Sequence, residues 1–481
     1  MGRQTTSRVR VNVQMNNDLH YKTIHELAPL IRDGKLSSVE LTESQLARIE
    51  QLDGRLKSYA TVMAASAIEQ AKTTDKEIAA GNYRGPLHGI PVAVKDLCAT
   101  KGVRTMGGSA VFADNVPDYD STVVARFNQA GAVMLGKLNL TEGAMGGYNP
   151  KLDIPENPWK ESHWAGASSS GSGSATAAGL AFGTLGSDTG GSIRHPAAVC
   201  GTVGLKPTWG RVSRYGVMNL AESLDHVGPL TRSSADAGYV LQAISGLDPN
   251  DPTTLTQAVP DLTATLSAGV KGIKIGFDEN YATEDVEPDF AAAVVDGVRV
   301  MESLGAEIVP IKMPPRLREY MSAWSVICSS EAAAAHAETY PARSDEYGPF
   351  FRQWLANGTA HTATEFAQAD LLRAACVGEF RVLMQGIDLL AGPSTARAAY
   401  PVTPEGLYGP PPGDRDPWTS RFTVPSDYAG LPTISIPCGL NGDGLPLSLQ
   451  FVGHHLSEQL LIQSGHAFEQ ATDFHTLHPP V

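Results

Sequence analysis

Two stretches between residues 23 and 80 have the apolar spacing of helices. Between residues 23 and 53 apolar side chains recur every three or four positions, which predicts helix. Ser37 or Ser38 is the candidate N-cap within this stretch, because Glu40 follows near the first turn. A second helical pattern runs from residue 64 to residue 80. The residues that supply the apolar face of the first pattern are Val39, Leu41, Leu46 and Ile49.

The pattern then changes to short apolar runs that alternate with helices. Residues 89–96 and 132–137 are nearly continuous apolar segments and predict buried strands, the first of which ends in Lys95 and Asp96. Residues 121–130 between them have helical spacing, with Asp120 or Ser121 as the cap. Strands that alternate with helices predict an α/β sheet covered by helices on both faces.

The last two hundred residues are helical first and extended afterwards. Residues 290–390 have a mostly helical pattern, whereas residues 400–418 are rich in Pro and Gly and predict a long irregular loop. Residues 431–437 and 445–452 predict two further strands, and residues 456–471 predict the closing helix. Residues 1–19 are polar and predict a flexible N-terminal segment.

One segment has the composition of a flexible linker, but it contains apolar residues and lies within globular sequence. Residues 166–192 read GASSSGSGSATAAGLAFGTLGSDTGGS and are dominated by Gly, Ser and Ala. They also contain Leu180, Phe182 and Leu185, and globular sequence lies on either side. Small residues with apolar anchors are typical of backbone that packs tightly around a site. We therefore expect this segment to be part of the folded domain.

Charge and cysteine usage exclude several classes of protein. The formal charge is 37 − 51 = −14 without a long basic cluster, which argues against nucleic acid as a partner. The five cysteines are scattered and none forms a C-x-x-C pair, so we expect free thiols, a reducing cytoplasm, and neither a bound metal nor a cofactor. No apolar run is long enough to span a membrane.

Familiar catalytic motifs are missing from the sequence. It contains no G-x-S-x-G, no S-x-x-K, no H-E-x-x-H and no G-x-x-x-x-G-K-[S/T]. The thirteen histidines are dispersed, and a lone histidine is more often packed than catalytic. The chemistry must therefore be sought without histidine.

Three other short stretches contain residues that could take part in catalysis. Lys95 ends an apolar strand, where burial would lower the pKa of its ammonium and make the neutral amine available as a base. Ser168 begins a run of three serines. Ser192 follows two glycines, an arrangement in which backbone N–H groups can converge near the hydroxyl as an oxyanion hole requires. Taken alone, a lysine such as Lys95 is more often on the surface, and each of the two serine stretches is more often a solvated turn.

Together these pieces resemble the amidase signature family. The resemblance rests on the run GSDTGGSIR at 186–194, on GLKPT at 204–208, and on GIPVAVKD at 89–96. It extends over roughly residues 22–475. It implies an α/β fold in a single large domain, residues 20–481, with a central, mostly parallel or mixed, twisted sheet between helices. The implied core is about residues 80–230 plus 425–475, and residues 290–420 form a variable substrate region.

The resemblance also implies roles for individual residues. Ser192 would be the nucleophile, Ser168 a bridging serine on a cis peptide, and Lys95 the general base. Ala167 and Ser170 replace two glycines that are usual in the family, so Ser169 remains an alternative bridge. The implied oxyanion donors are the amides of Thr189, Gly190, Gly191 and Ser192. The implied substrate-binding residues are Gly143, Met145 and Gly146, although Met145 could equally fill the core.

The expected activity is hydrolysis of C–N amide bonds through a Ser192 acyl-enzyme. Carbamate (urethane) or ester cleavage would use the same chemistry. The expected protein is a cytoplasmic monomer or homodimer that acts on a small-molecule amide. The alternative is the glutaminase subunit of a tRNA-dependent amidotransferase, which would work only inside a multi-subunit assembly.

Overall fold

A mixed sheet of eleven strands runs through the computed structural model, which describes residues 19–409 and 417–481. The strand order is β1-β3-β2-β4-β6-β5-β10-β11-β9-β7-β8. The strands are β1 (Tyr59–Val62), β2 (Pro91–Lys95), β3 (Val133–Leu138), β4 (Gly183–Asp188), β5 (Val203–Lys206), β6 (His226–Thr231), β7 (Lys274–Phe277), β8 (Glu307–Pro310), β9 (Leu389–Pro393), β10 (Thr433–Leu440) and β11 (Pro446–Gly453).

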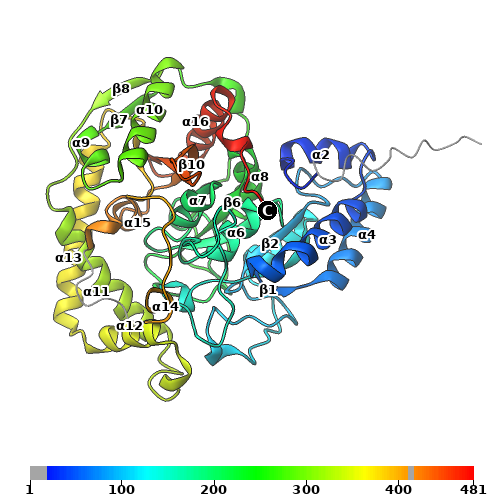
Figure 1. Cartoon of the computed structure of the whole chain (residues 1–481), viewed down its shortest axis with the longest axis horizontal. Coiled ribbons are helices and arrows are strands. Elements are labelled where there is room, and N and C mark those ends of the chain that lie inside the picture. The colour runs from blue at the N-terminus through cyan, green and yellow to red at the C-terminus, as the bar shows by residue number, and fades with distance from the viewer. Residues whose placement is uncertain (1–18, 410–416) are drawn as a thin grey trace, which may run out of the picture.

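Helices connect these strands and pack around the sheet. The N-terminal helices α2, α3 and α4 lie at one end of the molecule, and α11, α12 and α13 lie at the other (Figure 1). The helices are α2 (Ile24–Arg32), α3 (Ser38–Leu56), α4 (Ala64–Ala79), α5 (Thr122–Ala130), α6 (Ser170–Ala177), α7 (Arg194–Cys200), α8 (Ser234–Ile244), α9 (Glu279–Thr283), α10 (Pro288–Ser303), α11 (Leu317–Ala335), α12 (Pro349–Ala360), α13 (Ala363–Leu383), α14 (Pro404–Tyr408), α15 (Val424–Tyr428) and α16 (Glu458–Ala471).

The sheet is covered on both faces, as two adjacent residues of β6 illustrate. Leu230 pairs with Gly204, whose missing Cβ would meet Ala197 of α7. Its neighbour Thr231 pairs with Gly183, whose missing Cβ would meet Val240 of α8. Because successive residues of a strand face opposite sides, α7 and α8 cover opposite faces. Every residue of β2, β3, β4 and β6 is buried, and the predicted α/β fold is confirmed.

Strand direction divides the sheet into three parts. β3, β2 and β4 are parallel near one end, where β1 pairs antiparallel with β3 at the edge, and β8, β7 and β9 are parallel at the other end. The strands between these groups are antiparallel, including the C-terminal hairpin of β10 and β11, which pairs with β5 on one side and β9 on the other. The last strands of the chain therefore join the two parallel groups.

Local sequence explains where the helices begin. The pattern over residues 23–53 is two helices rather than one, because Ser37 and Glu40 form a capping box that starts α3 at Ser38. The Pro- and Gly-rich segment 400–418 is not wholly irregular, since Thr403 caps the short helix α14. Residues 410–416 of that segment, and residues 1–18 of the predicted flexible N-terminus, lie outside the described residues.

Candidate active site

Lys95 is the last residue of β2 and is fully buried. Burial removes water from its ammonium group and lowers the pKa to about 7, although the Asp225 and Asp188 carboxylates act in the opposite direction. With a pKa of about 7, a large fraction of Lys95 is neutral near neutral pH.

Two serine hydroxyls lie within hydrogen-bond distance of Lys95. Its Nζ donates to Ser168 Oγ at 2.7 Å and to Ser187 Oγ at 2.9 Å. Ser187 lies near the end of β4, the parallel neighbour of β2, so the two side chains meet at the same edge of the sheet. Ser168 lies just before α6, and the peptide bond between Ala167 and Ser168 is cis.

Ser192 lies in the turn between β4 and α7 and is half-buried. Its carbonyl accepts a hydrogen bond from the Ser169 amide at 3.3 Å, which places the turn beside the Ser168 segment. Within the described residues no hydrogen bond joins the hydroxyls of Ser192 and Ser168. The structure thus brings Lys95 and Ser168 into direct contact and sets Ser192 next to them through the backbone.

The orientations of the peptides before Ser192 are fixed from outside the turn. The carbonyl of Thr189 accepts from Trp324 Nε1 at 2.9 Å, and that of Gly190 accepts from Thr423 Oγ1 at 2.7 Å. The Gly191 carbonyl accepts from the amide of His195, in the first turn of α7, at 2.7 Å. In the described part of the chain the amides of Thr189, Gly190 and Ser192 donate no hydrogen bond.

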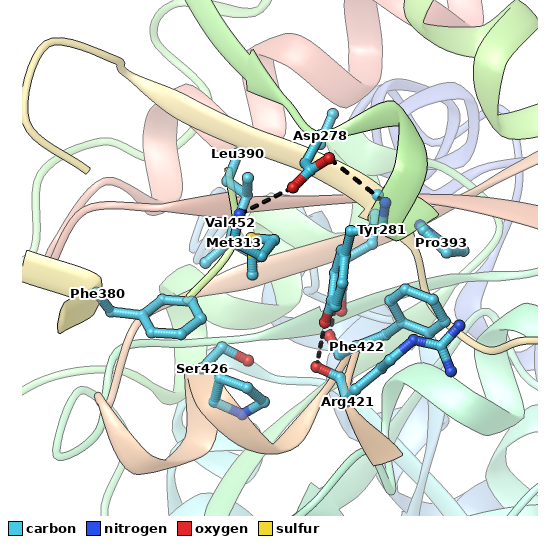
Figure 2. Close-up of a pocket in the computed structure, with 14 residues that line it drawn as sticks. Asp278, Tyr281, Met313, Phe380, Leu390, Pro393, Arg421, Phe422, Ser426 and Val452 are labelled. Carbon is cyan, nitrogen blue, oxygen red and sulfur yellow. Dashed lines mark hydrogen bonds between the residues drawn. The ribbon is translucent and has the colours of Figure 1, made fainter. Parts of the chain in front are cut away.

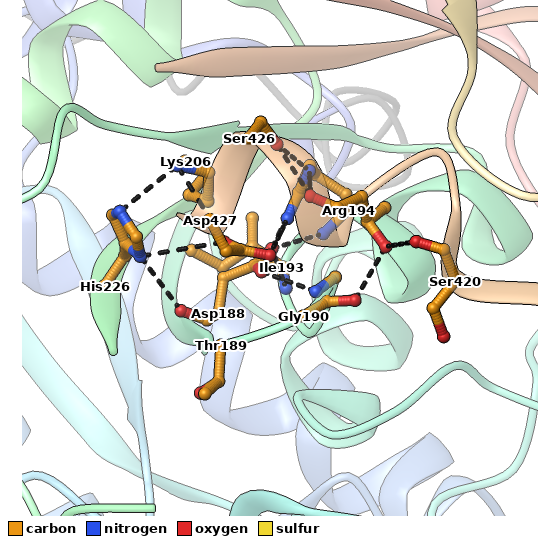
Figure 3. Close-up of polar contacts among 12 residues, drawn as sticks. Asp188, Thr189, Gly190, Ile193, Arg194, Lys206, His226, Ser420, Ser426 and Asp427 are labelled. Atoms are coloured by element: carbon orange, nitrogen blue, oxygen red, sulfur yellow. Dashed lines mark hydrogen bonds and ion pairs between the residues drawn. The ribbon is translucent and has the colours of Figure 1, made fainter. Parts of the chain in front are cut away.

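The carboxylate of Asp188 is the centre of the turn (Figure 3). It accepts from the Gly191 amide at 2.6 Å and from the Ile193 amide at 3.0 Å, on either side of Ser192. Arg194 contacts the same carboxylate through Nε at 3.0 Å and Nη2 at 2.8 Å. The Arg194 charge and these hydrogen bonds outweigh the effect of burial and hold the pKa of Asp188 well below its usual range.

The loop predicted to bind substrate packs against α12. Gly143 has a φ of 58°, and a Cβ atom added to it would lie 2.1 Å from the Phe351 ring. A Cβ atom added to Gly146 would lie 2.8 Å from the Phe350 ring. Met145 is 8% exposed and belongs to the main hydrophobic core. The loop is tied to the serine segment because the Thr141 amide donates to the Ser168 carbonyl at 3.2 Å.

Two pockets lie near these elements. Gly143 lines a pocket of about 230 Å³, partly open to solvent, together with Leu97 and His336. A second pocket, of about 400 Å³, lies at the carboxyl ends of β7 and β9, where Tyr281, Met313 and Phe380 point into the same space (Figure 2). This second pocket is mainly apolar, but it is also lined by Ser426 and Gln450, which contact Arg194.

Sequence reasoning missed some residues around the turn. Asp225 accepts from Thr189 Oγ1 at 2.6 Å, and burial raises the pKa of its carboxyl to about 6. Ser187 directly precedes Asp188 in the motif, so its position in β4 was the available signal for its contact with Lys95. Trp324 and Thr423 gave no comparable signal, because nothing local in the sequence links them to the turn.

The described residues contain no metal-binding cluster, no membrane-spanning helix and no disulfide. In residues 19–409 and 417–481 no group of three or more His, Cys, Asp or Glu side chains is placed to hold a metal ion. None of the helices described is both long and apolar enough to cross a membrane. All five cysteines are buried and free.

Comparison with known proteins gives the family of the chain. The family model described as Amidase matches residues 40–462. The putative amidase AmiD of Mycobacterium tuberculosis (strain ATCC 25618 / H37Rv) is 45% identical, with 95% of each chain covered. A glutamyl-tRNA(Gln) amidotransferase subunit from Moorella thermoacetica is 40% identical, with 96% of this chain and 99% of that protein covered.

A solved structure supports the same assignment. The native peptide amidase from Stenotrophomonas maltophilia superposes with a TM-score of 0.82 at 31% identity, covering 94% of this chain and 97% of that one. The family model and the 45% identical relative both extend over most of the sequence. The chain is therefore an amide-hydrolysing enzyme that belongs to the amidase signature family.

Proposed function

We propose that the protein is a stand-alone amidase in which Ser192 is the nucleophile, Ser168 carries protons and Lys95 is the general base. The observation that supports this proposal best is the contact of 2.7 Å between Lys95 Nζ and Ser168 Oγ in a buried setting. Because the pKa of Lys95 is lowered to about 7, the amine can accept a proton at neutral pH.

The first half of the reaction forms an acyl-enzyme. Ser168 passes its proton to neutral Lys95 and takes the proton of Ser192, whose Oγ then bonds to the substrate carbonyl carbon. Ser168 next protonates the amide nitrogen and regains its own proton from Lys95. The C–N bond breaks and the amine leaves. Water, activated by the same pair of residues, then releases the carboxylic acid and restores Ser192.

The oxyanion formed on the carbonyl needs donors that are already oriented. We assign this role to the amides of Thr189, Gly190 and Ser192. The Gly191 amide, which the sequence also predicted as a donor, is occupied by Asp188 at 2.6 Å. Trp324 holds the Thr189 carbonyl, in the peptide that carries the Gly190 amide. The His195 amide holds the Gly191 carbonyl, in the peptide that carries the Ser192 amide. One such donor is worth about 2.7–4 kcal/mol in the transition state.

The substrate in this proposal is a small-molecule amide, and no cofactor takes part. A carbamate or an ester would form the same tetrahedral adduct. Gly143, Met145 and Gly146 are assigned to substrate binding. For Met145 the support is indirect, because its side chain packs in the core and would shape the pocket only from behind.

A glutaminase subunit is the second candidate function. The observation that favours it is the 40% identity to the Moorella amidotransferase protein across 99% of its length. A glutaminase of this kind releases ammonia from glutamine within a complex. Gel filtration combined with an assay separates the two functions: the proposed amidase hydrolyses simple amides as an isolated monomer or homodimer, whereas the glutaminase needs partner chains.

Labelling tests the assignment of the nucleophile. A fluorophosphonate should modify Ser192, identified by peptide mapping, and Ser192→Ala should abolish both labelling and hydrolysis of an amide panel. Ser66→Ala changes a serine that bonds only its own helix and serves as the control, with native labelling expected. Modification of another serine, with Ser192 untouched, would remove the basis of the proposal.

A further inference from the structure

A carboxylate from the C-terminal region reaches the turn that carries Ser192. Asp427 belongs to α15 and is fully buried, as is Arg194. Its Oδ2 accepts a hydrogen bond from Arg194 Nη2 at 2.7 Å, although 233 residues separate the two in sequence (Figure 3). Asp427 lies outside the motifs that carry the family resemblance.

The contact continues from Arg194 to the turn. The guanidinium donates to Asp427 on one side and, through two nitrogens, to Asp188 on the other. Asp188 in turn accepts from the amides of Gly191 and Ile193, the residues that flank Ser192. A guanidinium that is hydrogen-bonded to a carboxylate on each side cannot rotate freely. Asp427 therefore limits the movement of Arg194, and through it the movement of Asp188 and of the turn.

Other groups around Asp427 complete this arrangement. Ser426 Oγ and the Thr423 carbonyl accept from Arg194 Nη1 at 2.7 and 3.0 Å, so α15 and the residue before it take the remaining N–H groups. Lys206 Nζ lies 3.9 Å from Asp427 Oδ1, and burial raises the pKa of the Asp427 carboxyl to about 8 although Arg194 and Lys206 both act to lower it. Buried charges are tolerated only when they are paired in this way.

We propose that Asp427 is a positioning residue for amide hydrolysis, which acts through Arg194 and Asp188 to hold Ser192 in its reactive position. This inference rests on the proposed role of Ser192. Asp427 makes no contact with the reacting atoms. It is required as an acceptor for Arg194 Nη2, a role that an asparagine side chain of the same shape can also fill.

The experiment compares Asp427→Ala with Asp427→Asn on one amide substrate. We expect Asp427→Ala to lower kcat about 10- to 100-fold with little change in KM, because a small displacement of the attacking group costs that much. The fluorophosphonate labelling rate should fall in parallel. Asp427→Asn should restore kcat to within about threefold of native, because its amide oxygen replaces the lost acceptor.

A matched control separates positioning from stability. Asp236 is also a buried acceptor, but it binds the amides of Ile24 and His25 at the start of α2. Asp236→Ala should lower the melting temperature without changing kcat of the folded enzyme. Native kcat in Asp427→Ala, or an equal loss of kcat in Asp427→Ala and Asp427→Asn, would overturn the inference.

Two further variants cover the cases in which Asp427→Ala does not fold or Ser192 is not the nucleophile. If Asp427→Ala does not fold, Ser426→Ala removes a neighbouring acceptor of Arg194, and a severalfold loss of kcat at constant KM is expected. Unchanged kcat in that variant would count against the positioning role. Ser192→Ala tests the underlying function separately: if it still hydrolyses the amide, the proposed function fails, whatever Asp427 does.

Discussion

At the scale of single residues, the protonation of Lys95 decides how the proposed site works. A lysine on the surface keeps a pKa near 10.5 and is charged at neutral pH. Complete burial at the end of β2 disfavours the ammonium more than the nearby carboxylates favour it. The amine is then neutral in a large fraction of molecules without the help of a histidine.

The first prediction concerns pH. Because Lys95 must be neutral to accept a proton and its pKa is about 7, kcat/KM should rise with pH below about 7 and level off above it. The measurement is a pH profile on an amide that does not itself ionise, with circular dichroism showing that the fold persists at each pH. Full activity well below neutrality would contradict a lysine base.

The second prediction concerns the leaving group. An amine must be protonated before the C–N bond breaks, whereas an ester alkoxide leaves with little assistance. Lys95→Ala and Ser168→Ala should therefore slow amide hydrolysis by about 10²–10⁴-fold and slow ester hydrolysis less. The comparison is kcat/KM for a matched amide and ester pair. An equal loss for both substrates would mean that Lys95 activates Ser192 but does not help to protonate the leaving group.

The sequence predicted part of this site and could not predict the rest. The contact between Lys95 and Ser168 was expected, because the family resemblance implies that Lys95 is the general base and Ser168 the bridging serine. Asp427 was not expected, because only the folded chain brings it to Arg194 across 233 residues. The hydroxyl of Ser187 was also missed: its place in the motif was visible, but its contact with Lys95 depends on β4 lying next to β2 in the sheet.

At the scale of elements, local chemistry was the more reliable guide. Ser37 and Ser121 stand at the helix starts where capping residues were sought, and β2 and β3 lie largely within the predicted apolar runs. The sequence marked the start of α3 at Ser37 but not the end of α2 at Arg32, because the apolar spacing continues across the break. Packing between elements, such as the loop at Gly143 against α12, lies beyond such patterns.

The third prediction tests that packing. In Gly143→Ala the new Cβ would lie 2.1 Å from the Phe351 ring at a φ of 58°. The variant should lose about 1–2 kcal/mol from the left-handed backbone and a further 1–3 kcal/mol or so from overpacking. Chemical denaturation measures the loss, and activity should fall too, because this loop is hydrogen-bonded to Ser168.

Gly102→Ala is the matched control for this substitution. Gly102 also has positive φ, at 73°, but no atom lies within 4 Å of the position of its missing Cβ. It should show only the backbone cost, about 1–2 kcal/mol, with native activity. Equal losses of stability in the two variants would mean that Phe351 moves aside freely and that α12 does not constrain the loop.

At the scale of the whole molecule, the order of strands makes the hairpin of β10 and β11 essential to the sheet. β10 pairs with β5 and β11 pairs with β9, so the hairpin lies between the two parallel groups. Neither group has another connection through backbone hydrogen bonds in the described sheet. The sequence predicted both strands of the hairpin but gave no indication of their central position.

The fourth prediction follows from this position. A chain that ends at Gly430 lacks β10 and β11 and exposes the edges of β5 and β9, so it should aggregate rather than form a smaller native protein. A chain that ends at Ala471 keeps every strand and α16 and should remain folded. Solubility and circular dichroism of the two truncations provide the measurement. A soluble, cooperatively unfolding product of the shorter truncation would show that one half of the sheet folds alone.

The central hairpin also has a consequence for biosynthesis. Residues 433–453 leave the ribosome after the other nine strands of the described sheet, yet they lie inside the strand order of the finished sheet. Until then the nascent chain carries two incomplete half-sheets, each with an open edge next to the missing strands. The described sheet can be completed only after residue 453 has emerged. The yield of folded enzyme in a cell therefore depends on how well chaperones shield those edges while synthesis continues.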